Sequence, residues 1–87
     1  MTIDREEKKL QELGFEEVKW YGLINNDGYT FKKNDIKYDL RHWVNCYGAE
    51  VNFWSLSGWV DGSRENVKLD KSSFDTFDEA LNFIKTI

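Results

Sequence analysis

The 87-residue sequence contains no proline, a single cysteine and a single histidine, and each of these shortages excludes something. Without proline there is no proline-rich linker, so we expect one domain over residues 1–87. The lone Cys46 cannot form an intramolecular disulfide, and no apolar secretion signal accompanies the charged residues near the N-terminus. Both features favour a reducing, cytoplasmic setting. No apolar run approaches the roughly 18–20 residues that cross a membrane, so we expect no membrane partner.

The common catalytic and metal-binding patterns are also missing. A nucleophilic triad needs a base, and the only histidine, His42, is interpreted as a partly buried structural residue near the end of a strand. Cys46 falls in a predicted hairpin turn, with no second histidine or helix N-terminus to activate its thiol. One cysteine and one histidine cannot build a structural zinc site, and six scattered glycines form no phosphate-binding loop. We therefore expect a non-enzymatic protein without a cofactor or metal.

Charge is unevenly distributed along the chain. Twelve basic and sixteen acidic residues give a formal net charge of −4. Residues 1–17 and residues 61–79 each hold six acids against three bases, whereas residues 18–60 hold five bases against four acids. A non-specific binder of nucleic acid is expected to show a basic excess, because its affinity comes from neutralising phosphates. The sequence instead predicts acidic ends around a nearly neutral middle.

Helical signals occur at the two ends. Residues 4–13 are predicted to form a short helix that Gly14 closes in a left-handed conformation. Near the C-terminus, Thr76 and Glu79 have the spacing of a capping box. An apolar face with helical spacing follows, made of Phe77, Ala80, Leu81, Ile84 and Ile87.

Between these helices the apolar residues alternate with a period of two, which is typical of strands. We expect strands over residues 16–21, 29–32, 36–44, 49–56 and 65–69, with turns at 25–28, 33–35 and 45–48 and an irregular hairpin or loop at 57–64. The predicted fold class is α+β. An antiparallel meander of four or five strands would be flanked by both helices on one face, as a two-layer sandwich of order α-β-β-β-β-(β)-α.

One face of this sheet would then remain without helices. Alternation in the third strand directs Ile36, Tyr38 and Leu40 inward, and in the fourth strand we assign Ala49, Val51 and Phe53 to the core. The residues expected to face outward are Lys37, Asp39, Arg41, Trp43, Glu50, Asn52 and Trp54, with Trp59 in the neighbouring loop. Two interpretations are open. In the first, the tryptophans only stabilise the sheet, either by cross-strand packing or by packing under a covering 57–64 loop. In the second, they form a partner-binding surface.

The leading functional hypothesis is a protein-binding or inhibitor domain whose partner has a basic surface and handles nucleic acid. Trp43, Trp54 and Trp59 would anchor the contact, since Trp, Tyr and Arg dominate binding hot spots. A small, acidic, aromatic-rich and cysteine-poor composition resembles that of phage anti-defence proteins (including anti-CRISPR inhibitors) and acidic immunity proteins, a likeness of profile that no motif carries. The alternatives are a module that stacks single-stranded nucleic acid on the sheet, or a purely structural domain.

Overall fold

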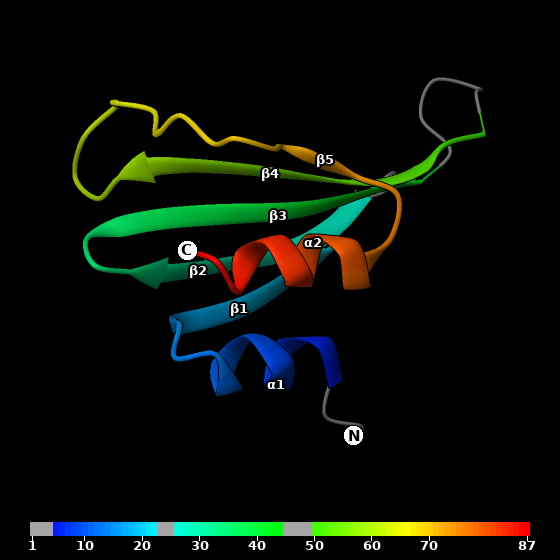
Figure 1. Cartoon of the computed structure of the whole chain (residues 1–87), viewed down its shortest axis with the longest axis horizontal. Coiled ribbons are helices and arrows are strands. Elements are labelled where there is room, and N and C mark those ends of the chain that lie inside the picture. The colour runs from blue at the N-terminus through cyan, green and yellow to red at the C-terminus, as the bar shows by residue number, and fades with distance from the viewer. Residues whose placement is uncertain (1–4, 23–25, 45–49) are drawn as a thin grey trace.

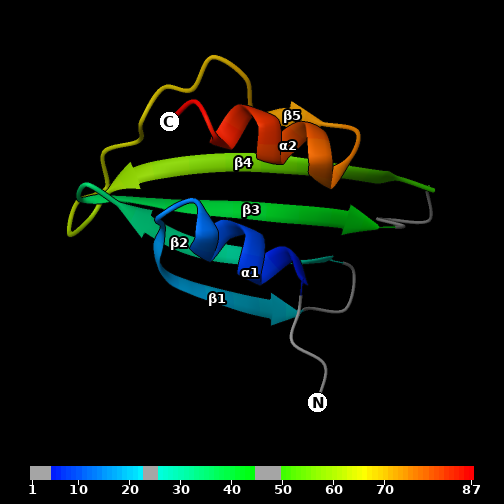
Figure 2. The ribbon, with the colours of Figure 1, turned by 60° about the horizontal axis from the view of Figure 1, so that its bottom comes forward.

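The computed structural model describes residues 5–22, 26–44 and 50–87, and these form an α+β fold (Figure 1). Its elements are α1 (Arg5–Glu12), β1 (Glu16–Gly22), β2 (Asn26–Lys33), β3 (Ile36–Val44), β4 (Asn52–Val60), β5 (Ser73–Phe74) and α2 (Phe77–Ile84). The five strands make one antiparallel sheet in the order β1-β2-β3-β4-β5, and both helices lie against the same face (Figure 2). The predicted two-layer meander is confirmed.

Both predicted helices are present, and their ends follow local rules. Gly14 has a φ of 91° directly after α1, the left-handed conformation that glycine adopts without a steric penalty. At α2, the Thr76 side chain accepts a hydrogen bond from the Glu79 backbone N–H (3.2 Å), while the Glu79 carboxylate accepts one from the Asp75 N–H (3.2 Å). The bond to Thr76 is the one that the predicted capping box requires, and it satisfies a donor that the helix N-terminus leaves without a partner, whereas the Glu79 carboxylate reaches one residue beyond the N-cap.

The predicted turns have different outcomes. Asn34 and Asp35 have φ values of 52° and 66°, which suit a two-residue type I′ hairpin between β2 and β3, so the turn at 33–35 is confirmed. The turn predicted at 25–28 is wrong, because Asn26 begins β2 and Gly28 lies inside it. Asn26, Asp27 and Gly28 are typical turn residues, but here they pair with β3, and Asp27 and Gly28 pair with β1 as well, which keeps them in a strand. Asn25 and the turn predicted at 45–48 lie outside the described residues.

The fourth strand was predicted with the wrong phase. β4 begins at Asn52 and runs to Val60, and Trp54 and Leu56 are its buried side chains (6% and 3% exposed), whereas Phe53 points away from the helices. Because successive strand residues face opposite sides, an error of one residue reverses every assignment. The correct pattern alternates Trp54 and Leu56 with serines, and it continues past residue 56, where the predicted strand ended.

The segment after β4 also differs from its prediction. Residues 57–60 belong to β4, and the chain then turns and follows the free side of β4 through scattered hydrogen bonds, such as Val67 N–H to Gly58 O (2.9 Å) and Leu56 N–H to Ser72 O (2.9 Å) (Figure 1). Only one bridge, Trp59 with Asn66, falls in the stretch 65–69 that was predicted as a strand. The short fifth strand comes later, where the buried Phe74 joins the core.

One hydrophobic core lies between the sheet and the helices. Its centre holds side chains that are almost inaccessible to water, among them Leu10 of α1, Tyr29 and Phe31 of β2, Leu40 of β3 and Ile84 of α2. The Tyr29 hydroxyl also donates a hydrogen bond to the Glu6 carboxylate (3.2 Å), which ties α1 to the sheet. Since the helices occupy this face, they leave the opposite face of the sheet uncovered.

Candidate functional site on the outer face of the sheet

The outer face is formed by the side chains of β1 to β4 that point away from both helices. Strand register arranges them in rows across the sheet. One half, the aromatic end, consists of Tyr21, Asp39, Arg41, Trp43, Phe53 and Ser55. The other half, the lysine end, consists of Lys19, Thr30, Lys32, Lys37 and Trp59.

A hydrogen-bonded triad holds the middle of the aromatic end. The Tyr21 hydroxyl donates to the Asp39 carboxylate (2.6 Å) and accepts from Nε of Arg41 (3.0 Å), and the Arg41 guanidinium also pairs with Asp39 (3.2 Å). Tyr21 reaches β3 by crossing β2 above Gly28. A Cβ at position 28 would lie 2.9 Å from the Tyr21 oxygen and would also collide with the backbone oxygen of Leu40. This strand glycine therefore provides the space that the triad needs.

The triad changes the titration of its tyrosine. Partial burial, reinforced by the hydrogen bond to Asp39 and opposed by Arg41, raises the pKa of Tyr21 to about 12. The hydrogen bond from Arg41 to the Tyr21 oxygen raises the pKa of the guanidinium in turn. Tyr21 therefore stays neutral and Arg41 stays charged at any physiological pH, so the aromatic end presents a constant set of donors and acceptors.

Trp43 is held in one orientation at the edge of the triad. Its indole Nε1–H donates to the Ser55 hydroxyl (2.9 Å), and its ring lies nearly parallel to that of Phe53, with centroids 6.3 Å apart. The Arg41 guanidinium lies 5.2 Å from the Trp43 ring, within the range of a cation–π interaction. These contacts order an aromatic surface that remains only half-buried in the chain itself.

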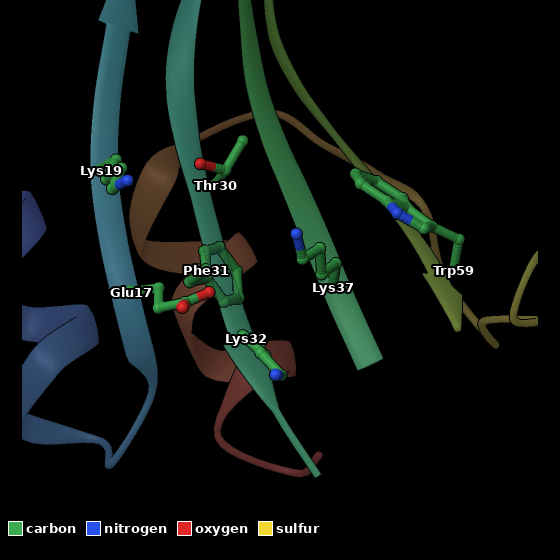
Figure 3. Close-up of a pocket in the computed structure, with 7 residues that line it drawn as sticks. All are labelled: Glu17, Lys19, Thr30, Phe31, Lys32, Lys37 and Trp59. Atoms are coloured by element: carbon green, nitrogen blue, oxygen red, sulfur yellow. The ribbon is translucent and has the colours of Figure 1, made fainter. Parts of the chain in front are cut away.

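The lysine end surrounds a shallow, open hollow of about 190 Å³ (Figure 3). Lys32 lies directly opposite Lys37 in the β2–β3 register, and Asp61 bridges the two ammonium groups at 3.0 and 3.5 Å. The Asp61 carboxylate raises the pKa of Lys32, and the Lys32 ammonium lowers the pKa of Asp61. Lys19, Thr30, Glu17 and the Trp59 ring complete the rim.

Trp54 and Asn52 do not belong to this face, which corrects their predicted positions. Trp54 lies in the core, where its ring stacks on His42 (centroids 4.3 Å apart, 5° between planes) and meets Phe77 of α2 edge-on. His42 is partly buried, as predicted, and its two ring nitrogens face Asn52 Oδ1 (2.7 Å) and Asp27 Oδ1 (3.2 Å). Asn52 thus lies on the helix side of the sheet and contacts the histidine there.

Of the remaining predicted site residues, Asp39, Arg41 and Trp43 lie together at the aromatic end, as the alternation in β3 indicated. Glu50 is exposed but precedes β4, outside the paired strands. Trp59 belongs to the outer face through β4 and not through a covering loop. Sequence reasoning missed Tyr21, Phe53 and Ser55 as site residues. The alternation of β1 indicated which way Tyr21 points, but only the register shows that it reaches Asp39.

The described part of the chain has a two-layer α+β fold in which no helix covers the partly aromatic outer face of the sheet. Comparison with family models, curated proteins and solved structures finds no match for the chain. Within the described ranges, no group of three or more His, Cys, Asp and Glu side chains is arranged to hold a metal ion. No helix of that part is long and apolar enough to span a membrane.

Proposed function

We propose that this protein is a non-enzymatic binding domain that recognises another protein through the aromatic end of its outer sheet face. The observation that carries the proposal is the ordered set of Tyr21, Arg41, Trp43 and Phe53 on a face that the helices leave uncovered. Trp, Tyr and Arg are the residue types that dominate protein-binding hot spots. Inhibition by contact, the activity expected from the composition, is one form of such binding.

Pre-organisation supports a binding role. Association costs free energy when flexible side chains must be ordered at the interface. Here Ser55 already holds the Trp43 indole, and Tyr21 with Asp39 already holds the Arg41 guanidinium. A partner that covers this surface would therefore gain contact area without ordering these groups.

The charged side chains of the outer face indicate what kind of partner surface would fit it. Among the described side chains of the outer face and its rim, four bases (Lys19, Lys32, Lys37 and Arg41) meet four acids (Glu16, Glu17, Asp39 and Asp61). The acids responsible for the net charge of −4 therefore lie elsewhere, Asp78 and Glu79 of α2 among them. Contact at the aromatic end would accordingly depend on apolar packing and hydrogen bonds, whereas a basic partner surface would also have to reach the helix layer.

The test is affinity purification from the native host with three versions of the full chain. Wild type and Trp20→Ala should retain the same partner, and Trp43→Ala/Phe53→Ala should lose it. Trp20 is a matched control because it is a tryptophan that is 53% exposed on the edge strand, away from the aromatic end. Circular dichroism and thermal melting would establish that all three versions are folded.

Two results would contradict the proposal. If the folded double variant kept every partner of the wild type, the aromatic end would serve only the stability of the sheet. If the wild type retained no protein at all, protein recognition would not be its function.

A further inference from the structure

The lysine end departs from a general rule of sheet stability. Lys32 and Lys37 are direct cross-strand neighbours, and like charges in that position are destabilising. Asp61 offsets this repulsion, but it is one carboxylate shared by two ammonium groups. Positions where a local rule is broken are often functional. The arrangement suits the binding of an additional anion.

The charges around the hollow indicate what kind of anion fits. Lys19 from β1 adds a third ammonium group to the lining of the hollow, where Glu17 is the one carboxylate. Asp61 and Glu16, the register partner of Lys32, lie beside these lysines and offset most of their charge, so the hollow suits a group with no more than a single negative charge. A phosphodiester carries one such charge, and lysine binds phosphate oxygens as a point charge.

Trp59 adds a flat apolar wall beside these lysines. It is the register partner of Lys37 on β4, and its ring borders the hollow across from Lys19 (Figure 3). Nucleic-acid bases stack on such rings with little dependence on sequence. At about 190 Å³ the hollow is smaller than the roughly 300–1,000 Å³ of sites that enclose small molecules. It therefore suits one unit of a longer chain.

We infer that the lysine end binds a segment of single-stranded nucleic acid. Lys19, Lys32 and Lys37 hold a phosphodiester, the Thr30 hydroxyl donates to the same group, and the adjacent base stacks on Trp59. This site goes beyond the proposed protein contact, because it uses different side chains; the two ends meet where Thr30 is the register partner of Asp39. The net charge of −4 repels a polyanion as a whole, so binding is weak and steeply dependent on salt.

The experiment titrates the ¹⁵N-labelled full chain with a short oligothymidylate and follows the indole N–H signals, while fluorescence anisotropy gives the affinity. Addition should shift the Trp59 signal. Trp59→Ala should weaken binding by roughly 5- to 150-fold, the measured range for one stacked base. Lys19→Ala should reduce the slope of log K against log salt by about 0.7.

Matched variants separate this site from general electrostatics and from the aromatic end. Lys68→Ala/Lys85→Ala removes two exposed lysines that do not border the hollow and should keep the Trp59 shift. Asp61→Asn removes the shared counter-ion and should strengthen binding. Trp43→Ala/Phe53→Ala should keep the oligothymidylate site, so loss of the protein partner and loss of this site can be told apart.

Three outcomes would overturn the inference. The first is the absence of any Trp59 shift with oligothymidylate. The second is binding of inorganic phosphate with the same affinity and the same residues, which would make the hollow a simple anion site. The third is saturation by a polyglutamate peptide but not by oligothymidylate, which would assign the lysines to an acidic protein partner.

Discussion

Trp43 and Trp54 were both predicted to face outward, but they lie on opposite sides of the sheet. Trp54 is 6% exposed and packs between His42 and Phe77, whereas Trp43 lies half-buried on the outer face against Phe53. The hydrophobic effect scales with the apolar area removed from water, so the two rings contribute unequally to stability. Residue identity alone does not separate a core tryptophan from one at a surface.

This difference predicts two distinct mutant phenotypes. Trp54→Ala should lower the free energy of unfolding by about 3–5 kcal/mol, the usual cost of removing a large buried aromatic ring. Trp43→Ala should cost only about 1–2 kcal/mol, because its ring is already partly in water. Urea denaturation followed by circular dichroism would measure both, with Trp54→Phe as a milder variant that stays folded. Equal losses for Trp43 and Trp54 would contradict the assignment of the two faces.

At the level of elements, α2 combines strong local signals with a fully apolar inner side. Its N-terminus is closed by Thr76 and Glu79, and Phe77, Ala80, Leu81 and Ile84 are buried against the sheet. Because capping and periodicity agree, both its start and its buried face were predictable from sequence. The sequence of β4 is ambiguous in this respect. Val51 and Phe53 fall on one side and Trp54 and Leu56 on the other, and all four are apolar, so alternation does not show which side faces the core.

The cap of α2 can be tested directly. Thr76→Ala removes the acceptor for the Glu79 N–H and should lower the free energy of unfolding by about 1 kcal/mol. Asn82→Ala, an exposed change within the same helix, should leave stability unchanged or raise it slightly, because alanine has the higher helix propensity. Thermal or urea unfolding of the two variants would give the comparison. A loss as large for Asn82→Ala as for Thr76→Ala would argue against a specific cap.

For the whole molecule, the sheet separates two surfaces of different chemistry. The helices and the core occupy one side, while the outer face carries hydrogen-bonded aromatics at one end and lysines at the other. The outer-face side chains are therefore not part of the core, but their protonation still affects stability, that of Tyr21 above all.

Stability should therefore fall at alkaline pH in a way that depends on Tyr21. In the unfolded chain a tyrosine loses its proton near pH 10, whereas Tyr21 keeps its proton in the folded protein up to about pH 12. Between these values unfolding releases a proton, so the contribution of Tyr21 is fully present below pH 10 and is lost as pH rises toward 12. Tyr21→Phe should be less stable at neutral pH but should lose less stability over that interval. Parallel curves of unfolding free energy for the two proteins would contradict this coupling.

Local signals in the sequence determined both helices, the 33–35 hairpin turn and the facing of β3, because capping residues, positive-φ turn residues and alternation act over a few neighbours. Tertiary structure decided the phase of β4, the position of the fifth strand and the place of Gly28 inside β2. It also decided the candidate site. Tyr21 meets Asp39, and Lys32 meets Lys37 and Asp61, only through the register of separate strands. Register depends on how a whole core packs, which no short stretch of sequence contains.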